Sequence, residues 1–323
     1  MKVEKVLVLL PLNDKQKESL EERFTNIKFI YNKADNVDEE SIKSVEVIIG
    51  NPKTDYLKYA ENLKWIQLNS AGADKYIKEG VLNPKIALTN ATGAYGLAIS
   101  EHMMGLLLNI FKKLNKYLEN QKNHIWNDEG VVRTIYGSKI LIVGLGNIGE
   151  EFAKRAKAFG AYVIGVRHSN RGKPEFIDEI YLIDDIEELL PQADVVVLTL
   201  PNTKETYKMF DSHKLKLMKK GSVLLNAGRG TVLDTDALCD EIENGHLLGA
   251  GLDVVDPEPL TQEHRIWDIE NIIITPHVSG GYHIKETLEN ILNISMDNLS
   301  RFINGDELKN VIDFSTGYAK NKK

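Results

Sequence analysis

The chain has 323 residues, of which 42% are hydrophobic and 27% charged, the ordinary composition of a soluble globular protein with a sizeable core. Its formal net charge of −7 gives no basic footprint, so we expect neither nucleic acid nor a membrane surface as a partner. The single cysteine, Cys239, excludes an internal disulfide, and no apolar stretch is long enough to span a bilayer. We therefore expect a cytoplasmic protein.

The first part of the chain alternates between strand and helix patterns. Short apolar runs predict strands at 5–10, 27–31, 45–50, 64–68 and 86–89, with helical stretches such as 14–24 between them. Alternation of this kind is typical of a parallel sheet covered by helices. A long helical segment rich in Met and Leu follows at about 98–120.

A glycine-rich turn, Gly144-Leu145-Gly146-Asn147-Ile148-Gly149, lies between a predicted strand at 139–143 and a predicted helix at 148–159. A further strand is predicted at 162–166. In this context the first glycine permits a tight turn, the second admits a pyrophosphate, and the third lets helix and strand pack closely. The phosphates would lie on the free N–H groups at the helix N-terminus. The alternative is a glycine turn that binds no phosphate.

The position of this turn predicts the domain organisation. A dinucleotide-binding domain at the start of a chain carries its turn near the N-terminus, whereas Gly144 lies far into this one, so another domain must precede it. Strands are predicted at 195–200, 222–226, 248–252 and 272–275, a helix at 234–244, and a last helix at 284–302 that is too small to fold alone. We therefore predict an α/β fold with a doubly wound Rossmann domain at 99–285. This domain is inserted into a smaller, flavodoxin-like substrate domain made of 1–98 and 286–323.

Three polar residues follow successive predicted strands. Arg229 follows 222–226, Glu258 lies in a proline-flanked loop after 248–252, and His277 follows 272–275. Ligands bind beyond the carboxyl ends of strands in such sheets, so the three should converge near the glycine turn. An arginine grips a carboxylate and polarises a carbonyl, a histidine exchanges a proton near neutral pH, and a carboxylate favours the charged imidazole. Singly, each has an ordinary structural explanation; together with a nicotinamide they predict hydride transfer between 2-keto and 2-hydroxy acids.

The sequence resembles a known family, the D-isomer-specific 2-hydroxyacid dehydrogenases, over nearly its whole length. The resemblance is to the short members of the phosphoglycerate dehydrogenase and hydroxypyruvate/glyoxylate reductase type. It rests on the glycine turn and on five further stretches: Asn69-Ser70-Ala71-Gly72-Ala73-Asp74, Ser100-Glu101-His102, Asn226-Ala227-Gly228-Arg229-Gly230, 251–260, and Ile274-Thr275-Pro276-His277.

The resemblance implies a role for each matching residue. His277 would be the acid/base with Glu258 as its partner, Arg229 would hold the carboxylate and keto oxygen, and Asn69, Ser70, Ala71 and Gly72 would offer backbone N–H groups to the substrate. The cofactor would be bound by Gly144, Gly146, Asn147, Ile148, Gly149, Leu200, Pro201, Thr206, Ala227, Gly228 and Asp253, the last on the nicotinamide carboxamide. The segment 98–120 would belong to a homodimer contact, and His102 is interpreted as a packing or capping residue.

One departure from the family pattern concerns the choice of cofactor. A carboxylate at the end of the second strand binds the ribose hydroxyl of NAD, but the matching residue, eighteen positions after Gly149, is Arg167. With His168, Ser169 and Arg171 it would suit a 2′-phosphate, so NADP is favoured over NAD. The alternative is that these are solvated loop residues.

Two competing functions stay open at this stage. The same fold and catalytic trio occur in a dinucleotide-sensing corepressor, a binding protein without metabolic turnover, although this chain offers no interaction tail beyond 320–323. Formate oxidation is disfavoured because related proteins pair the histidine with glutamine, and this chain has Glu258. No spacing of His, Cys, Asp and Glu suggests a metal site.

Overall fold

The computed structural model describes residues 2–168, 172–282 and 284–314. It divides into two compact units. Unit 1 comprises Met1–Tyr95 and Ile284–Lys323, and unit 2 comprises Gly96–His283. The chain therefore leaves unit 1 after Tyr95 and returns to it at Ile284, which makes unit 2 an insertion.

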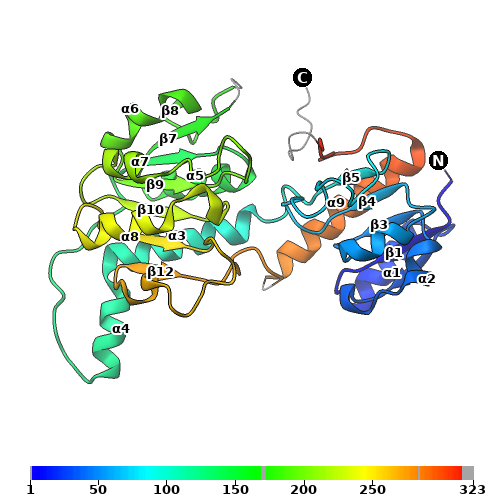
Figure 1. Ribbon diagram of the computed structural model, residues 1–323, viewed down its shortest axis with the longest axis horizontal. Helices are drawn as coiled ribbons and strands as arrows, with labels where there is room; N and C mark the ends of the chain where they lie inside the picture. Colours follow the sequence, from blue (N-terminus) through cyan, green and yellow to red (C-terminus); the bar gives the residue numbers. More distant parts are fainter. Residues whose placement is uncertain (1, 169–171, 283, 315–323) are drawn as a thin grey trace. The chain divides into compact units, whose positions relative to one another are not determined.

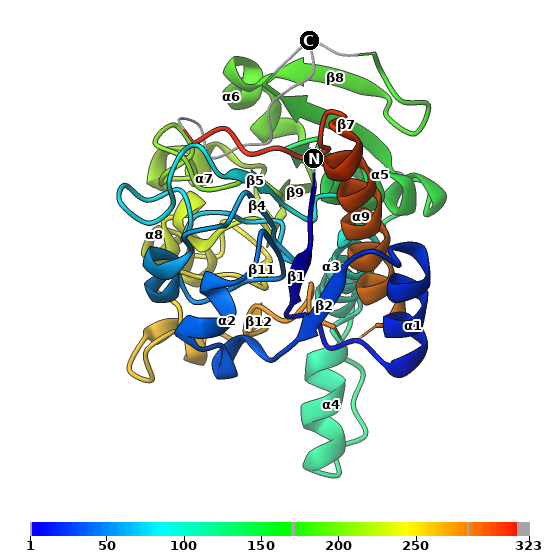
Figure 2. The same cartoon turned by 90° about the vertical axis from the view of Figure 1, so that its right-hand side faces the viewer.

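Unit 1 is a parallel sheet of order β2-β1-β3-β4-β5, drawn from blue to cyan in Figures 1 and 2. Its elements are β1 (Lys5–Val8), α1 (Asp14–Arg23), β2 (Lys28–Tyr31), α2 (Glu39–Lys43), β3 (Val47–Ile49), β4 (Trp65–Gln67), β5 (Ala87–Thr89) and α9 (Lys285–Asn304), with short 3₁₀ turns at Ala34–Asn36 and Thr54–Tyr59. This strand order is the flavodoxin-like one.

The core of unit 1 has two faces because alternate strand residues point to opposite sides of the sheet. Ile48 and Ile66 join Ile42 of α2 in one buried cluster. On the other face Trp65 stacks on Phe302 of α9, with ring centroids 5.3 Å apart. The C-terminal helix thus completes the core of a sheet formed at the start of the chain.

Unit 2 is a seven-stranded parallel sheet of order β12-β11-β10-β9-β6-β7-β8. Its strands are β6 (Lys139–Val143), β7 (Tyr162–Arg167), β8 (Glu179–Leu182), β9 (Val195–Leu198), β10 (Val223–Asn226), β11 (Gly249–Leu252) and β12 (Ile272–Ile274). Its helices are α3 (Gly96–Lys112), α4 (Leu114–Lys122), α5 (Asn147–Ala158), α6 (Ile186–Leu189), α7 (Ser212–Leu217) and α8 (Thr235–Glu243), with 3₁₀ turns at Ile183–Asp185, Leu190–Gln192, Gly230–Val232 and Arg265–Asp268. Counted within the unit, this is the Rossmann order with a seventh strand, and the order reverses between β6 and β9.

Local sequence explains where these elements begin and end. The central strands of unit 2, such as β9 and β10, are apolar on both sides because helices cover both faces of a parallel sheet. The Asp234 side chain accepts from the N–H of Ala237 and so starts α8. The two parallel sheets with these strand orders confirm the predicted α/β fold class.

The predicted long helix at 98–120 is wrong in one respect, because the structure breaks it into α3 and α4. Lys113 has a left-handed backbone conformation with φ of 55°, which no continuous helix allows. The Asn109 side chain accepts from the N–H of Asn115 and stabilises the break. The sequence reading also missed β8, an edge strand whose residues are only partly buried or exposed.

Candidate active site

The glycine turn lies at the carboxyl end of β6 and opens α5. Gly144 has φ of +108°, a backbone angle that residues with a Cβ rarely adopt. The Thr199 hydroxyl donates to the Gly144 carbonyl at 2.6 Å. A Cβ on Gly149 would lie 2.2 Å from that same carbonyl oxygen, so only glycine lets α5 pack this closely on the turn. By contrast, a Cβ on Gly146 would meet nothing within 4 Å. The first and third glycines therefore build the turn, and the second faces open space.

This turn has the properties of a phosphate site. Gly146 is the N-cap residue of α5 and provides no side chain to accept from the first N–H groups of the helix. Asn147 is the first residue of α5, and its side-chain oxygen lies against α3, 2.5 Å from where a Cβ on Gly96 would be, so the donors at this helix end are the backbone N–H groups. Unpaired donors at the end of a twelve-residue helix favour an anion, which fits a pyrophosphate.

The other residues assigned to the cofactor follow the neighbouring strands. Leu200 and Pro201 come after β9, and Thr206, which is 6% exposed, donates to the Pro201 carbonyl at 2.6 Å and so shapes that loop. Ala227 and Gly228 come after β10, and Ile148 lies in the first turn of α5.

Arg167 is the last residue of β7, and the exposed His168 follows it. The guanidinium donates to the Gly172 carbonyl through two bonds of 3.4 Å, and its Nε is buried without a partner among the described residues. Ser169 and Arg171 lie outside the described residues. The end of the second strand of the unit therefore carries a weakly engaged cation where a carboxylate would favour NAD.

His277 and Glu258 form a hydrogen-bonded pair. His277 Nδ1 lies 2.9 Å from Glu258 Oε2, and the other carboxylate oxygen, Oε1, accepts from the N–H of Val255 at 3.2 Å. Both side chains are partly exposed, 49% for His277 and 38% for Glu258. The carboxylate thus holds the imidazole by one nitrogen, and Nε2 stays available to a ligand.

Arg229 follows β10, the strand beside β11. Its Nη1 donates to the Gly228 carbonyl at 2.8 Å, which orients the base of the guanidinium. A Cβ on the next residue, Gly230, would lie 1.9 Å from the Val255 carbonyl oxygen. The turn that bears Arg229 is therefore packed directly on the loop that leads to Glu258.

Asp253, assigned to the nicotinamide carboxamide, is 2% exposed and already engaged by protein donors. Its Oδ1 accepts from Thr275 Oγ1 at 2.6 Å and from the N–H of Val278 at 3.1 Å. Its Oδ2 accepts from the hydroxyl and, at 3.2 Å, the N–H of Ser279. The carboxylate therefore holds the segment that carries His277.

The predicted substrate loop, Asn69–Gly72 of unit 1, follows β4 and has its carbonyl groups turned inward. Its four carbonyl oxygens accept, in chain order, from the Tyr95 hydroxyl, the Ala91 N–H, the Asn90 side chain and the Ser70 hydroxyl. Within the described ranges, the backbone N–H groups of Ser70, Ala71 and Gly72 have no acceptor. A run of free N–H groups on a loop whose carbonyls are all engaged suits a carboxylate.

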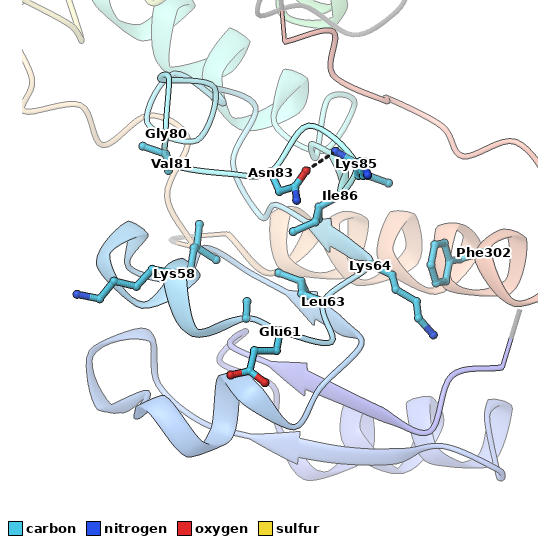
Figure 3. Close-up of a pocket in the computed structure, with 13 residues that line it drawn as sticks. Lys58, Glu61, Leu63, Lys64, Gly80, Val81, Asn83, Lys85, Ile86 and Phe302 are labelled. Carbon is cyan, nitrogen blue, oxygen red and sulfur yellow. Dashed lines mark hydrogen bonds between the residues drawn. The ribbon is translucent and has the colours of Figure 1, made fainter.

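A hollow of about 610 Å³ in unit 1 lies at the opposite edge of that sheet (Figure 3). It is next to Lys64 and Ile86, which directly precede β4 and β5. Figure 3 shows Lys58, Glu61 and Lys64 pointing away from one another. The hollow therefore has no converging polar groups and contains none of the predicted site residues.

The described part of the chain offers neither a metal site nor a membrane-spanning helix. Among residues 2–168, 172–282 and 284–314, no group of three or more His, Cys, Asp and Glu side chains could hold a metal ion. No helix in the part of the chain that the structure describes is long and apolar enough to cross a bilayer.

Comparison with known proteins decides the family. A sequence model described as D-isomer specific 2-hydroxyacid dehydrogenase, NAD binding domain, matches residues 104–279. A glyoxylate reductase from Thermococcus litoralis is 32% identical over 85% of this chain and 85% of its own length. The chain belongs to the D-isomer specific 2-hydroxyacid dehydrogenase family.

Solved structures of D-2-hydroxyacid dehydrogenases agree with this assignment. A family protein from Aeromonas salmonicida has a TM-score of 0.87 and 30% identity, covering 97% of this chain and 100% of its own. An NADPH-dependent glyoxylate/hydroxypyruvate reductase from Sinorhizobium meliloti, solved with NADP and sulfate, has a TM-score of 0.82 and 25% identity, covering 98% of this chain and 100% of its own.

This D-2-hydroxyacid dehydrogenase is therefore an NAD(P)-linked oxidoreductase of 2-keto and 2-hydroxy acids with a nicotinamide dinucleotide cofactor. The predicted family, fold class and enzyme class are confirmed. The corepressor-like alternative receives no support from these relatives.

Sequence reasoning missed one contact in this dehydrogenase. His102 Nε2 lies 2.9 Å from Thr275 Oγ1, the hydroxyl that in turn meets Asp253. The sequence indicates only a packing or capping role for His102, but this contact joins it to the loop of His277. The two residues are 173 positions apart, and no periodicity or motif spacing marks such a pair.

Proposed function

We propose that this dehydrogenase reduces a small 2-keto acid of the glyoxylate or hydroxypyruvate type to the D-2-hydroxy acid, with His277 as the proton donor. The observation that carries the proposal is the His277–Glu258 pair at 2.9 Å, beyond the carboxyl ends of two adjacent strands. A carboxylate on Nδ1 keeps a proton on that nitrogen and stabilises the imidazolium, so Nε2 is the atom that exchanges a proton with substrate.

The remaining residues have complementary parts in this proposal. The Arg229 guanidinium binds the substrate carboxylate and polarises the keto group, because it offers several donors in one plane. The free N–H groups of Ser70, Ala71 and Gly72 bind the same class of anion. A nicotinamide dinucleotide supplies the hydride when bound. His277 donates its proton to the keto oxygen as negative charge develops there, and Glu258 stabilises the cation before that transfer.

We also propose that NADP is preferred over NAD. The support is the Arg167 side chain at the end of β7, where its described hydrogen bonds are both as long as 3.4 Å. A 2′-phosphate would offer this guanidinium shorter, charge-assisted hydrogen bonds. The Sinorhizobium meliloti relative, an NADPH-dependent enzyme, supports the same choice.

We further propose a homodimer, formed through α4 and the segment 123–136 that follows it. Figure 1 shows α4 projecting from the rest of unit 2, with the next segment returning along it. Several large apolar side chains are exposed there: Leu114, Tyr117, Leu118, Ile125, Trp126, Val131, Val132 and Tyr136. A concentration of exposed apolar side chains on one projecting element is typical of a subunit contact.

The function is tested by assaying glyoxylate, hydroxypyruvate and pyruvate with NADPH and with NADH. We expect turnover with at least one acid and a kcat for His277→Gln lower by about 10²- to 10⁴-fold, because a positioned proton donor contributes that much. Cofactor affinity of the variant, measured by fluorescence titration, should match that of the natural protein.

The matched control is His213→Gln. His213 is also paired with a glutamate, with its Nε2 3.6 Å from Glu187 Oε2, but it lies on α7 and is exposed. It should keep the natural kcat. The assignment fails if no acid is turned over with either cofactor, or if His277→Gln is as active as His213→Gln.

A further inference from the structure

A chain of hydrogen bonds connects helix α3 to the loop that carries His277. His102 lies in the second turn of α3, with its side chain 27% exposed, and its Nε2 is 2.9 Å from Thr275 Oγ1. The Thr275 hydroxyl is 2.6 Å from Asp253 Oδ1. All three residues belong to unit 2.

The proton positions in this chain follow from its chemistry. A carboxylate can only accept, so the single hydroxyl proton of Thr275 is donated to Asp253. The Thr275 oxygen then has only lone pairs left for His102, and His102 Nε2 must be the donor. The chain therefore has one direction, from the imidazole through the hydroxyl to the buried carboxylate.

Asp253 in turn holds the backbone of the catalytic loop. It accepts from Val278 and Ser279, and its own carbonyl accepts from the N–H of His277 at 2.8 Å. His277 has φ of +52°, a left-handed conformation that is unfavourable for a residue with a Cβ. Such a conformation persists only where the surrounding structure holds it.

Helix α3 is a rigid place from which to support this loop. A Cβ on Gly251 of β11 would lie 2.9 Å from the Leu106 Cβ, one turn of α3 beyond His102, so the helix lies directly on the sheet. A side chain anchored on such an element holds its partner more accurately than one on a loop.

We propose that His102 is a positioning residue for catalysis: acting through Thr275 and Asp253, it holds the His277 loop where proton transfer occurs. The inference rests on the role of His277 proposed above. It assigns to His102 no contact with substrate or cofactor.

The test compares His102→Leu, which removes the donor, with His102→Gln, which keeps an N–H donor. We expect His102→Leu to lower kcat by about 10- to 100-fold, because small displacements of a catalytic group cost rates of that order. Its cofactor affinity and melting temperature should stay near those of the natural protein, and His102→Gln should recover a large part of the rate.

A deuterium isotope effect separates positioning from folding. With a cofactor deuterated at the carbon that donates the hydride, a misplaced proton donor makes the chemical step slower and raises the isotope effect on kcat. A smaller folded fraction lowers kcat and leaves the isotope effect unchanged. His102→Leu should therefore show the larger isotope effect, whereas the control Ser100→Ala, which removes a bond to the Leu97 carbonyl on the same helix, should show neither change.

Thr275→Val removes the middle of the chain at nearly constant volume and tests the link from its other end. It should reproduce the His102→Leu defect, and the double variant should be no worse than Thr275→Val alone, because both changes break one pathway. Additive losses, or a natural kcat and isotope effect in both single variants, overturn the inference. His277→Gln, measured in the same assay, distinguishes this failure from that of the proposed function: an active His277→Gln removes the function itself.

Discussion

Arg167 is the residue whose identity most changes the chemistry expected of this member of the family. It ends β7 as a cation with two long hydrogen bonds to one carbonyl. At this place a guanidinium attracts the 2′-phosphate of NADP, whereas a carboxylate repels it and instead binds the ribose hydroxyl of NAD. The proposed preference for NADP therefore rests on the charge of this side chain.

Changing Arg167→Asp should reverse the preference. We expect kcat/KM with NADPH to fall about 10- to 100-fold, as the loss of charge-assisted hydrogen bonds implies. The value with NADH should hold or rise. Steady-state kinetics with both cofactors measures the ratio, and Arg167→Gln, which removes the charge without adding repulsion, should fall between the two. A ratio that is the same in all three proteins contradicts the proposal.

At the scale of elements, the turn between β6 and α5 separates two kinds of glycine. Gly149 packs against the Gly144 carbonyl, whereas a Cβ on Gly146 would enter open space, and the extended backbone of Gly146 is one that other residues also adopt. Packing within the chain requires glycine at position 149, whereas Gly146 leaves room for a ligand.

The variants Gly149→Ala and Gly146→Ala should therefore fail in different ways. Gly149→Ala should lose about 1–3 kcal/mol of unfolding free energy, the usual cost of overpacking. Gly146→Ala should unfold like the natural protein but bind NADPH about tenfold or more weakly, a loss of about 1.4 kcal/mol. Denaturant unfolding and fluorescence titration give the two readouts, and equal stability of the two variants would refute this division.

Sequence patterns predicted most of these elements because buried parallel strands are nearly continuous apolar runs. They predicted the β6 bounds as the structure has them and reached β10 to within one residue at its start. They missed β8, whose residues mix polar and apolar types at the sheet edge, and they missed the break at Lys113. That break depends on a backbone angle and on the Asn109 side chain, which no periodicity records.

The positions of the predicted site residues in the sheet could be read from the sequence to a similar extent. Strand ends in a parallel sheet share one edge, so Arg229, Glu258 and His277 could be placed there from their positions in the sequence. The hydrogen bond between His102 and Thr275, which supports the His277 loop, could not be predicted, because it depends on how α3 packs on the sheet. The orientation of the carbonyl groups in the loop Asn69–Gly72 could not be predicted either, because it depends on hydrogen bonds from residues distant in sequence, such as Asn90 and Tyr95.

At the scale of the molecule, the proposed dimer explains why the segment after α3 exposes so many apolar side chains. Leu118 is 57% exposed, and the Trp126 side chain is fully exposed. Large apolar surfaces of this kind are rarely left in water on a monomer. Most of α3 itself is buried within unit 2, so α4 and 123–136 are the parts available to a second copy.

The double variant Leu118→Glu and Trp126→Glu should dissociate the dimer, since negative charges that repel one another replace apolar contacts. Sedimentation of the natural protein should give the mass of two chains, and the variant should give one. Leu182→Glu, at an exposed apolar residue of β8, should leave the mass of the natural protein unchanged. A natural protein that sediments as a single chain would show that the segment has another role.

The return of the chain to unit 1 at Ile284 has a consequence for the order of folding. Trp65 of β4 stacks on Phe302, and Asn298 donates to the Gln67 side chain across 231 positions of sequence. Unit 2 is one continuous stretch and can fold as it is synthesised, whereas the sheet of unit 1 must wait for α9. During synthesis, the first strands made are therefore among the last to be covered, and contacts of such long sequence separation form slowly.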